Sequence, residues 1–115
     1  MREGVRVDAR GVVDCRVRHR ADGPGRQHGP PRRLYGKTRC CLLEIIREAL
    51  ERAGGGLESV IRTRLMLRDI SPWKEAARAH GEIFGAIRPA CTFVEVSGLI
   101  GDDWLIEVEA DGVVA

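Results

Sequence analysis

The chain lacks the features that mark membrane proteins, secreted proteins and nucleotide enzymes. Its 115 residues hold no apolar run near the roughly 18 that a membrane helix needs, and the start Met1-Arg2-Glu3-Gly4 has no apolar segment like that of a signal peptide. Neither a G-x-x-x-x-G-K-[ST] loop nor a Rossmann fingerprint is present. We therefore expect one cytoplasmic domain with no membrane contact.

The cysteines form no metal motif. Cys15, Cys40, Cys41 and Cys91 include no C-x-x-C pair, and no histidines stand at zinc-ligand spacing. We expect four reduced thiols, no metal and no cofactor.

Lysine and aromatic side chains are scarce where positive charge is concentrated. The net charge is only +2, but residues 1–40 carry 11 Lys or Arg against 4 Asp or Glu, and residues 41–115 carry 8 against 13. A basic arm can bind nucleic acid. Residues 1–33, however, contain no lysine and no aromatic side chain to stack on a base. This composition favours a bias of the coding sequence over a nucleic-acid-binding patch.

Apolar spacing from Tyr35 onward predicts alternating helices and strands. Residues 37–53 have a helical period that Gly54 would end, and residues 61–68 alternate between an apolar and a basic face. Ser71 as N-cap and Pro72 at the first position would open a second helix. The side chains expected on its packed face are Trp73, Ala76, Ala77, His80, Ile83 and Phe84. Strands at about 92–98 and 104–110 complete the pattern.

The first third of the chain is less regular. Val5, Val7, Val12, Val13 and Val17 indicate a short hairpin, whereas residues 22–31 are rich in Gly and Pro and indicate a loop. The resulting order β, β, α, β, α, β, β predicts a single α+β domain over residues 1–115. Its architecture would be a two-layer sandwich of a mixed sheet with two helices on one face.

The C-terminal quarter carries a family resemblance. Arg88-Pro89-Ala90-Cys91-Thr92 leads into Val94-Glu95-Val96, and a second strand carries Glu107-Val108-Glu109-Ala110. With Tyr35-Gly36-Lys37-Thr38-Arg39 as a helix entry, residues 35–110 resemble the RidA (YjgF-type) family of enamine/imine deaminases, also labelled endoribonuclease L-PSP. The resemblance implies a chorismate-mutase-like fold, a homotrimer, and a small-molecule cleft between each pair of subunits.

The resemblance also assigns residues to a site. Active members hydrolyse a short 2-imino or 2-enamino acid, which needs a cation for the carboxylate and a group that holds water. Glu107 takes the position of the catalytic water-orienting glutamate, and Glu109 is the weaker candidate. Substrate binding falls to Cys91, Thr92 and Arg88. Cys91 replaces the carboxylate-binding arginine, so we expect an imine/enamine-type binder or hydrolase that is not a standard 2-iminobutanoate deaminase.

Other interpretations remain open at this point. Cys91 could be a nucleophile paired with His80 or Glu107, although a small buried hydrophobic residue is the simpler interpretation. His80 is more simply a packed core residue than a general base. The alternative function is that of a nucleic-acid-binding or endoribonuclease/translation-inhibitor-type protein, and a third possibility is a damaged gene product without activity.

Residues 1–33 depart from the family, whose members carry there a strand reading roughly Val-Ser-Gly-Thr-Ala-Pro. The segment Cys15-Arg16-Val17-Arg18-His19-Arg20 can be encoded TGT-CGG-GTA-CGG-CAC-CGA, and the same bases read from the third one give Ser-Gly-Thr-Ala-Pro. We therefore predict that the gene is out of frame between about residue 12 and residue 33. The DNA sequence tests this, because a gene without those bases contradicts it.

Overall fold

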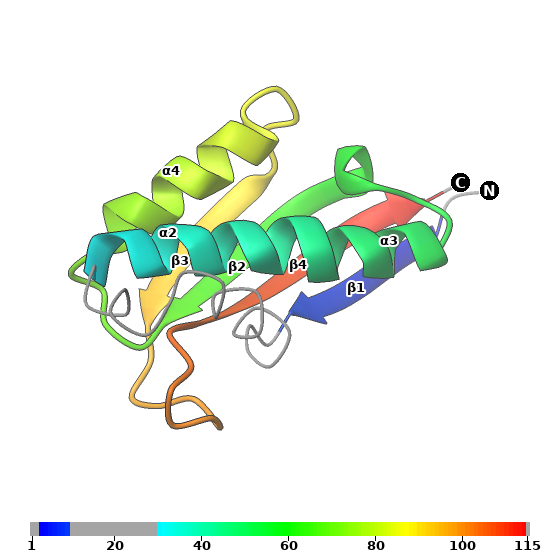
Figure 1. Cartoon of the computed structure of the whole chain (residues 1–115). Helices are drawn as coiled ribbons and strands as arrows, with labels where there is room; N and C mark the ends of the chain where they lie inside the picture. The colour runs from blue at the N-terminus through cyan, green and yellow to red at the C-terminus, as the bar shows by residue number, and fades with distance from the viewer. Residues whose placement is uncertain (1–2, 10–29, 115) are drawn as a thin grey trace.

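A mixed four-stranded sheet is covered on one face by helices in the computed structural model, which describes residues 3–9 and 30–114 (Figure 1). The strands are β1 (Glu3–Ala9), β2 (Val60–Leu67), β3 (Ala90–Glu95) and β4 (Ile106–Val114). Their order is β1-β4-β2-β3, with β2 and β3 parallel and the other pairs antiparallel. The predicted two-layer α+β fold is confirmed for this part of the chain. The second strand of the expected hairpin and most of the frame-altered segment lie outside the described residues.

A continuous helical segment runs along the sheet. It consists of α2 (Pro30–Cys40), the π-helical turn η3 (Cys41–Ile46) and α3 (Arg47–Arg52). The prediction of a loop through residue 31 and a helix entry at Tyr35 is wrong, because the helix already begins at Pro30. Proline fits there, since the first helical turn does not need its backbone N–H. Gly54 follows the helix with φ +96°, which confirms the predicted stop.

Helix α4 (Trp73–Phe84) connects the parallel strands β2 and β3. Ala76, His80 and Phe84 are buried as predicted, but Trp73 at the first position of the helix is 42% exposed. The expected N-cap is also wrong, because the Ser71 hydroxyl donates to the Asp69 carboxylate at 2.8 Å instead of capping the helix. The packed face was therefore predicted correctly except at its N-terminal end.

Strand β2 departs from strict alternation at its start. Thr63, Leu65 and Leu67 are buried beneath the helices as predicted, whereas Ile61 is 55% exposed. The pairing with β4 shifts between Val60 and Arg62, and Val60 occupies the buried position. A β-bulge of this kind adds one residue to one strand, so the side chains before the bulge point to the opposite sides of the sheet from those that regular alternation predicts. The assignment of Ile61 to the apolar face is therefore wrong.

The core lies between the helices and the two central strands. Its largest fully buried aliphatic side chains are Leu42, Ile46, Leu50, Leu65, Leu67, Ile106 and Val108. Strand β3, in contrast, is mostly exposed and pairs with β2 alone among the described residues. The sheet thus has a solvent-facing edge at β3. No helix in the described part of the chain is long and apolar enough to cross a membrane.

The expectation of four reduced thiols is wrong at Cys40, which is disulfide-bonded. A disulfide depends on how closely two residues approach in space, which their spacing along the chain does not reveal. Cys41 and Cys91 are free, and Cys15 lies outside the described residues.

Candidate functional site

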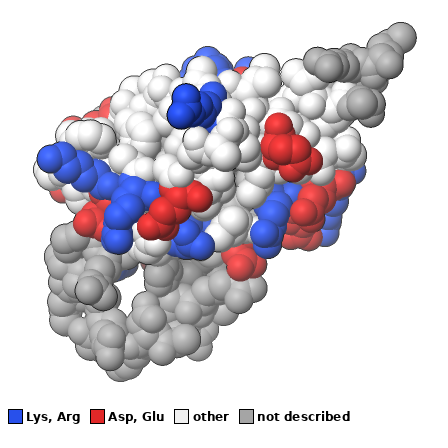
Figure 2. Space-filling view, turned by 90° about the horizontal axis from the view of Figure 1, so that it is seen from above, with Lys and Arg blue, Asp and Glu red and all other residues white. Residues whose placement is uncertain are grey.

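Charges of both signs are interspersed on the face seen in Figure 2, where Lys and Arg side chains lie next to Asp and Glu. One cluster joins α2 to α4. The Glu82 carboxylate accepts hydrogen bonds from the Tyr35 hydroxyl at 2.6 Å and from Arg39 at 2.9 Å, and the Tyr35 bond is the main cause of the lowered pKa of Glu82. The Arg78 guanidinium lies 4.1 Å from the centre of the Tyr35 ring. Positive side chains in this cluster are therefore engaged within the protein.

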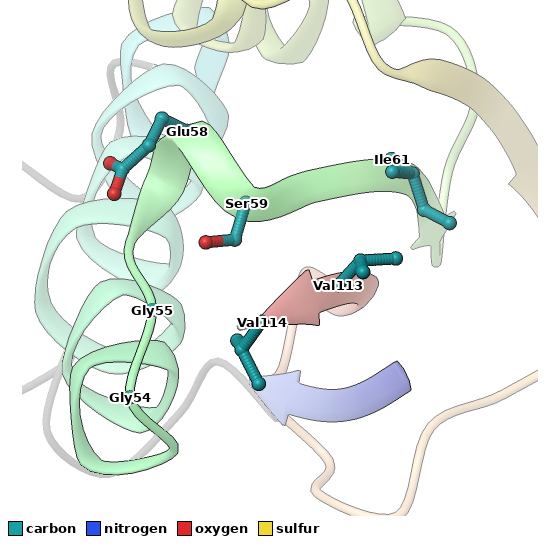
Figure 3. A pocket seen from close by; sticks show the side chains of 7 residues that line it. All are labelled: Gly54, Gly55, Glu58, Ser59, Ile61, Val113 and Val114. Atoms are coloured by element: carbon teal, nitrogen blue, oxygen red, sulfur yellow. The ribbon is translucent and has the colours of Figure 1, made fainter. Parts of the chain in front are cut away.

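A cavity of about 480 Å³ opens where β2 begins and β4 ends (Figure 3). It is lined by Gly54, Gly55, Glu58, Ser59, Ile61, Val113 and Val114. None of the residues predicted for the site is among them. Across residues 3–9 and 30–114, no three His, Cys, Asp or Glu side chains are grouped so that they could hold a metal ion.

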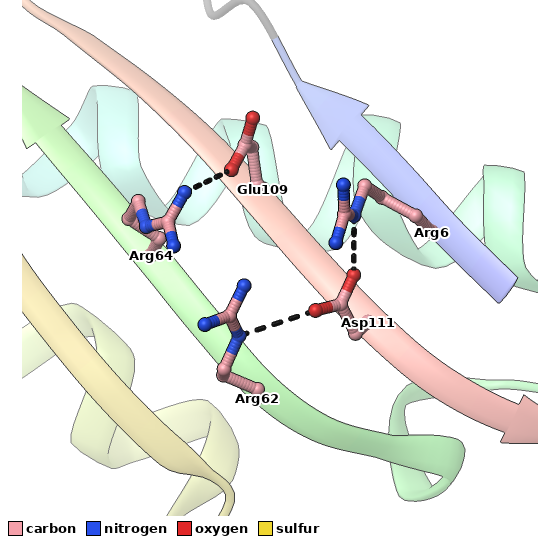
Figure 4. Close-up of polar contacts among 5 residues, drawn as sticks. All are labelled: Arg6, Arg62, Arg64, Glu109 and Asp111. Carbon is pink, nitrogen blue, oxygen red and sulfur yellow. Dashed lines mark hydrogen bonds and ion pairs between the residues drawn. The ribbon is translucent and has the colours of Figure 1, made fainter. Parts of the chain in front are cut away.

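The sheet face opposite the helices carries a network of ion pairs (Figure 4). Asp111 on β4 accepts hydrogen bonds from Arg6 on β1 at 2.7 Å and from Arg62 on β2 at 3.1 Å. These guanidinium groups, Arg6 first, hold the pKa of Asp111 below its ordinary value. Arg64 on β2 donates to Glu109 on β4 at 3.1 Å. Carboxylates of β4 therefore balance the basic face of β2.

Two carboxylates of β3 and β4 have different roles. Glu109 pairs with Arg64 of the basic face. Glu95 instead accepts a hydrogen bond from the backbone N–H of Ile70 at 2.8 Å, at the turn that precedes α4.

Glu107 lies on this open face together with Thr92. The register places Glu107 opposite Met66 on β2, and places Thr92 opposite Arg64. Glu107 is half-buried and Thr92 is exposed. Because side chains alternate along a strand, Glu107 and Glu109 point to the same side of the sheet, as expected.

Cys91 lies on the helix-covered face, beside Thr63 of β2. Thr63 Oγ1 lies 2.9 Å from His80 Nε2 on α4. Burial raises the pKa of the Cys91 thiol, and the neighbouring Thr63 hydroxyl acts in the opposite direction. Burial also lowers the pKa of His80. Both groups are therefore neutral near pH 7.

Two interpretations of these residues can now be decided. His80 is a packed core residue, as preferred, because it is 9% exposed and its ring centre lies 4.8 Å from that of Phe84. Cys91 is not a buried hydrophobic residue, because it is exposed on the edge strand β3. Of the two partners considered for Cys91, His80 is hydrogen-bonded to Thr63, which lies beside Cys91 in the register, whereas Glu107 lies on the other face with β2 between them.

Arg88 stands in the turn between α4 and β3. Its φ of +58° is the one positive value of a non-glycine residue in the described part of the chain, and its backbone N–H donates to the Phe84 carbonyl at 2.8 Å. The residue is exposed. The predicted site residues therefore do not converge within one chain, because Thr92 and Glu107 share the open face while Cys91 and Arg88 lie elsewhere.

Sequence reasoning missed two contributors to this region. The signal for Thr63 was a polar residue among the apolar positions of β2, and its hydroxyl proves to be the link to His80. Arg68 was predicted only as part of the basic face of residues 61–68. It donates from Nε to the Trp104 carbonyl at 2.7 Å and from Nη2 to the Gly101 carbonyl at 2.6 Å, and so holds the connection between β3 and β4.

Comparison with solved structures gives the class of this fold. Rv2704 from Mycobacterium tuberculosis, a member of the YjgF/YER057c/UK114 family, superposes with a TM-score of 0.68 and 43% identity, covering 70% of this chain and 68% of that one. A family model described as Endoribonuclease L-PSP matches residues 28–114. The chain belongs to this RidA-type family, as its C-terminal motif predicts.

Two curated relatives show similar agreement. The uncharacterized protein SCO2049 of Streptomyces coelicolor is 41% identical over 64 residues, which cover 56% of this chain and 48% of that protein. The 3-aminoacrylate deaminase RutC of Acinetobacter baylyi is 37% identical over 67 residues, covering 58% and 52%. The chain matches about half the length of these relatives.

Proposed function

We propose that this protein binds or hydrolyses a small imine or enamine without a free carboxylate, in a cleft completed by a second copy of the chain. Family membership and a relative named as a deaminase support the reaction class. The observation that carries the proposal is the neutral Cys91 thiol, exposed at the β3 edge in the position of the family's arginine.

The chemistry at position 91 argues against a small anionic substrate. A guanidinium binds a carboxylate through two charge-assisted hydrogen bonds, each worth about 1.5–3 kcal/mol. A protonated thiol beside a neutral histidine supplies no positive charge. The ligand that suits this position is therefore a neutral molecule, such as an enamine ester.

Glu107 is the proposed base. An enamine would first tautomerise to the imine, and water held by the Glu107 carboxylate would then attack the carbon of the C=N bond while the glutamate takes up a water proton. The glutamate then gives that proton to the nitrogen, and the C–N bond breaks as the new hydroxyl loses its proton, which releases ammonia and leaves a carbonyl product. Since one chain keeps Cys91 and Glu107 on opposite faces of the sheet, the proposal requires residues from two copies.

Assembly is the first test. A small domain gains stability by covering an open sheet face and an unpaired edge, so we expect a homotrimer. Light scattering should give about three times the 12.7 kDa chain mass. A monomer at micromolar concentration contradicts both the trimer and the shared cleft.

Activity is the second test, with 2-iminobutanoate as the anionic probe and ethyl 3-aminocrotonate as the neutral enamine. We expect 2-iminobutanoate to be hydrolysed no faster than in buffer, and the neutral probe to be hydrolysed faster. Glu107→Gln should abolish the second activity, whereas Glu48→Gln, on exposed α3, should not. Cys91→Arg should add activity on 2-iminobutanoate, which Glu107→Gln removes again. Robust hydrolysis of 2-iminobutanoate that survives Glu107→Gln would show that the site is misplaced.

The family description favours a second candidate, an RNA-directed activity. Removing residues 1–33 is not a clean test, because β1 would be lost from β4. Replacing Arg16, Arg18 and Arg20 by Gln keeps the chain length. We expect only weak RNA binding, independent of sequence and steeply reduced by salt, that these replacements remove. Specific cleavage that Glu107→Gln abolishes would favour the RNA-directed function instead.

A further inference from the structure

The proposed function does not use the cavity between the start of β2 and the end of β4 (Figure 3). Glu107 and Val113 of the cavity wall both lie on β4, six residues apart, which is about 20 Å along a strand. We propose that this cavity binds a small primary amine in its ammonium form, one that carries a short branched apolar group. Glu58 binds the charge, and Ile61 and the two valines of β4 cover the apolar group.

The cavity has the size and the division of surface that suit an amphipathic small molecule. Its volume of about 480 Å³ falls within the range of about 300–1,000 Å³ that is typical of ligand pockets. The Glu58 carboxylate and the Ser59 hydroxyl both turn toward the segment of Gly54 and Gly55, whereas Ile61 stands on the opposite side (Figure 3). A ligand with one polar end and one apolar end matches this arrangement.

The charge at the cavity is negative and uncompensated. Among the residues that line the cavity, Glu58 alone is charged. Its carboxylate forms no hydrogen bond or ion pair in the part of the chain that the structure describes. The arginines nearest to it in sequence are engaged elsewhere, because Arg52 pairs with Glu48 at 2.8 Å and Arg62 pairs with Asp111 at 3.1 Å. A cation on a ligand therefore has no competitor from these two arginines.

The end of the long helical segment makes the cavity more negative. Residues 30–52 are helical without interruption, and Gly54 and Gly55, which follow them, form part of the cavity wall. The backbone N–H of Gly55 donates to the Leu50 carbonyl at 2.8 Å and so ends the helix at this point. A helix C-terminus carries a partial negative charge that stabilises a nearby cation. The helix and the Glu58 carboxylate therefore both favour an ammonium group over an anion.

Two glycines leave space for the polar groups. A Cβ atom at Gly55 would lie 2.6 Å from both Ser59 Oγ and Val114 Cγ1, so a side chain there would fill the gap between the hydroxyl and the valine. A Cβ atom at Gly56 would lie 2.7 Å from Oε1 and 2.8 Å from Oε2 of Glu58, so the carboxylate is folded back over this residue. Ser59 Oγ accepts a hydrogen bond from the Gly56 N–H at 3.2 Å and keeps a second lone pair for an ammonium group.

The experiment is a titration of the isotopically labelled full chain with isoamylamine at pH 7, in which two-dimensional NMR follows the backbone amides of Gly54, Gly55 and Ser59. We expect saturable shifts with a Kd in the millimolar range, because the carboxylate is exposed and the apolar group is short. Isoamyl alcohol has a similar shape without the charge and should bind about tenfold more weakly, and the anion isovalerate should not bind. Methylamine should bind at least about fourfold more weakly, which is the effect of one buried CH₂ group.

Variants of the cavity separate its charge from its apolar wall. Glu58→Gln should weaken the binding of isoamylamine by about tenfold or more, whereas the matched control Glu51→Gln, on exposed α3 outside the cavity, should leave it unchanged. Gly56→Ala keeps the net charge but displaces the Glu58 carboxylate, so it should also weaken binding. Ile61→Ala should weaken the binding of isoamylamine but not that of methylamine, because it removes only part of the apolar wall.

An alkylammonium group can belong to a free amine or to a lysine side chain of another protein, and Nα-acetyl-lysine amide distinguishes the two. Tighter binding of this probe than of isoamylamine would overturn the assignment of a free amine.

Equal binding of isoamylamine and isoamyl alcohol overturns the proposal, as does isoamylamine binding that Glu58→Gln leaves unchanged. The absence of saturable shifts at millimolar amine has the same consequence. Amide signals that keep their positions in the rest of a variant show that it is folded, and the comparison of amine with alcohol in the unchanged protein needs no variant. The result is independent of the proposed function, because amine binding at this cavity requires neither Glu107 nor a second copy of the chain.

Discussion

Asp111→Asn tests whether the ion pairs of the open face stabilise the sheet. The Asp111 carboxylate joins β4 to both of its neighbours, through Arg6 at 2.7 Å and Arg62 at 3.1 Å. The arginine side chains are 64% and 41% exposed and that of Asp111 is 23% exposed. Pairs of this exposure contribute about 0.2–1 kcal/mol each. The substitution should therefore lower the free energy of unfolding by about 1 kcal/mol.

Acid pH and high salt should both reduce the difference in free energy of unfolding between Asp111→Asn and the unchanged protein. The pKa of folded Asp111 is lowered from 3.8, so the contribution of the pairs is complete above this pH and disappears as the pH falls through the folded value. Raising the salt concentration from about 0.1 to 1 M shortens the Debye length from about 10 to 3 Å and screens exposed pairs. The variant and the unchanged protein should converge under either condition.

Urea unfolding at pH 7 and at about pH 3, in low and high salt, measures the effect. Glu48→Gln is the matched control, because it removes a pair with Arg52 at 2.8 Å whose side chains are 60% and 79% exposed within a single helix. We expect that control to cost about 0.3–0.5 kcal/mol at most. Equal costs for the two substitutions, or a cost for Asp111→Asn that persists at acid pH, would refute the assignment of a cross-strand role.

Further outcomes follow from burial and backbone geometry. Leu65→Ala, at a fully buried position, should cost about 2–5 kcal/mol in urea unfolding, and Ile61→Ala at the exposed bulge less than about 1 kcal/mol. Gly54→Ala should destabilise the protein by about 1 kcal/mol, because Gly54 has a φ of +96°. Gly81→Ala in α4 should instead stabilise it by about 0.5–1 kcal/mol, because a Cβ atom at this position would have nothing within 4 Å. Stability should fall as the pH drops below 6.5, because the pKa of folded His80 is lowered, and His80→Phe should remove that dependence in thermal melts. Arg68→Met should increase amide hydrogen exchange in residues 96–105, whose connection it holds.

The sequence predicted the elements whose burial follows a simple period. Residues 37–53 and 73–84 repeat at helical spacing, and the alternation of Thr63, Leu65 and Leu67 matches one sheet face, so these assignments are confirmed. The strands at the C-terminus were placed within a few residues because a motif marked them. Family membership was predicted from the same motif, because the periodicity of a helix or a strand does not by itself account for its combination of residue types.

The predictions that failed concern features that depend on three-dimensional context. The residues around Pro30 do not distinguish a loop proline from one in the first turn of a helix. The bulge at Ile61 appears only when the partner strand is known. The placement of Cys91 beside Thr63, and the hydrogen bond from Thr63 to His80, require the lateral register of β2 and β3 and the position of α4, which bring together residues far apart in the sequence.

The bulge in β2 couples the length of a strand to the shape of the surface beside it. Ile61 is the additional residue of the bulge and also forms part of the wall of the cavity between the ends of β2 and β4. Deleting this one residue would bring the strand back into regular pairing and remove part of that wall in the same step. Insertions and deletions at this point would therefore change the volume of the cavity while Leu65 and Leu67 stay in the core, which gives protein engineers a way to reshape the surface without redesigning the fold.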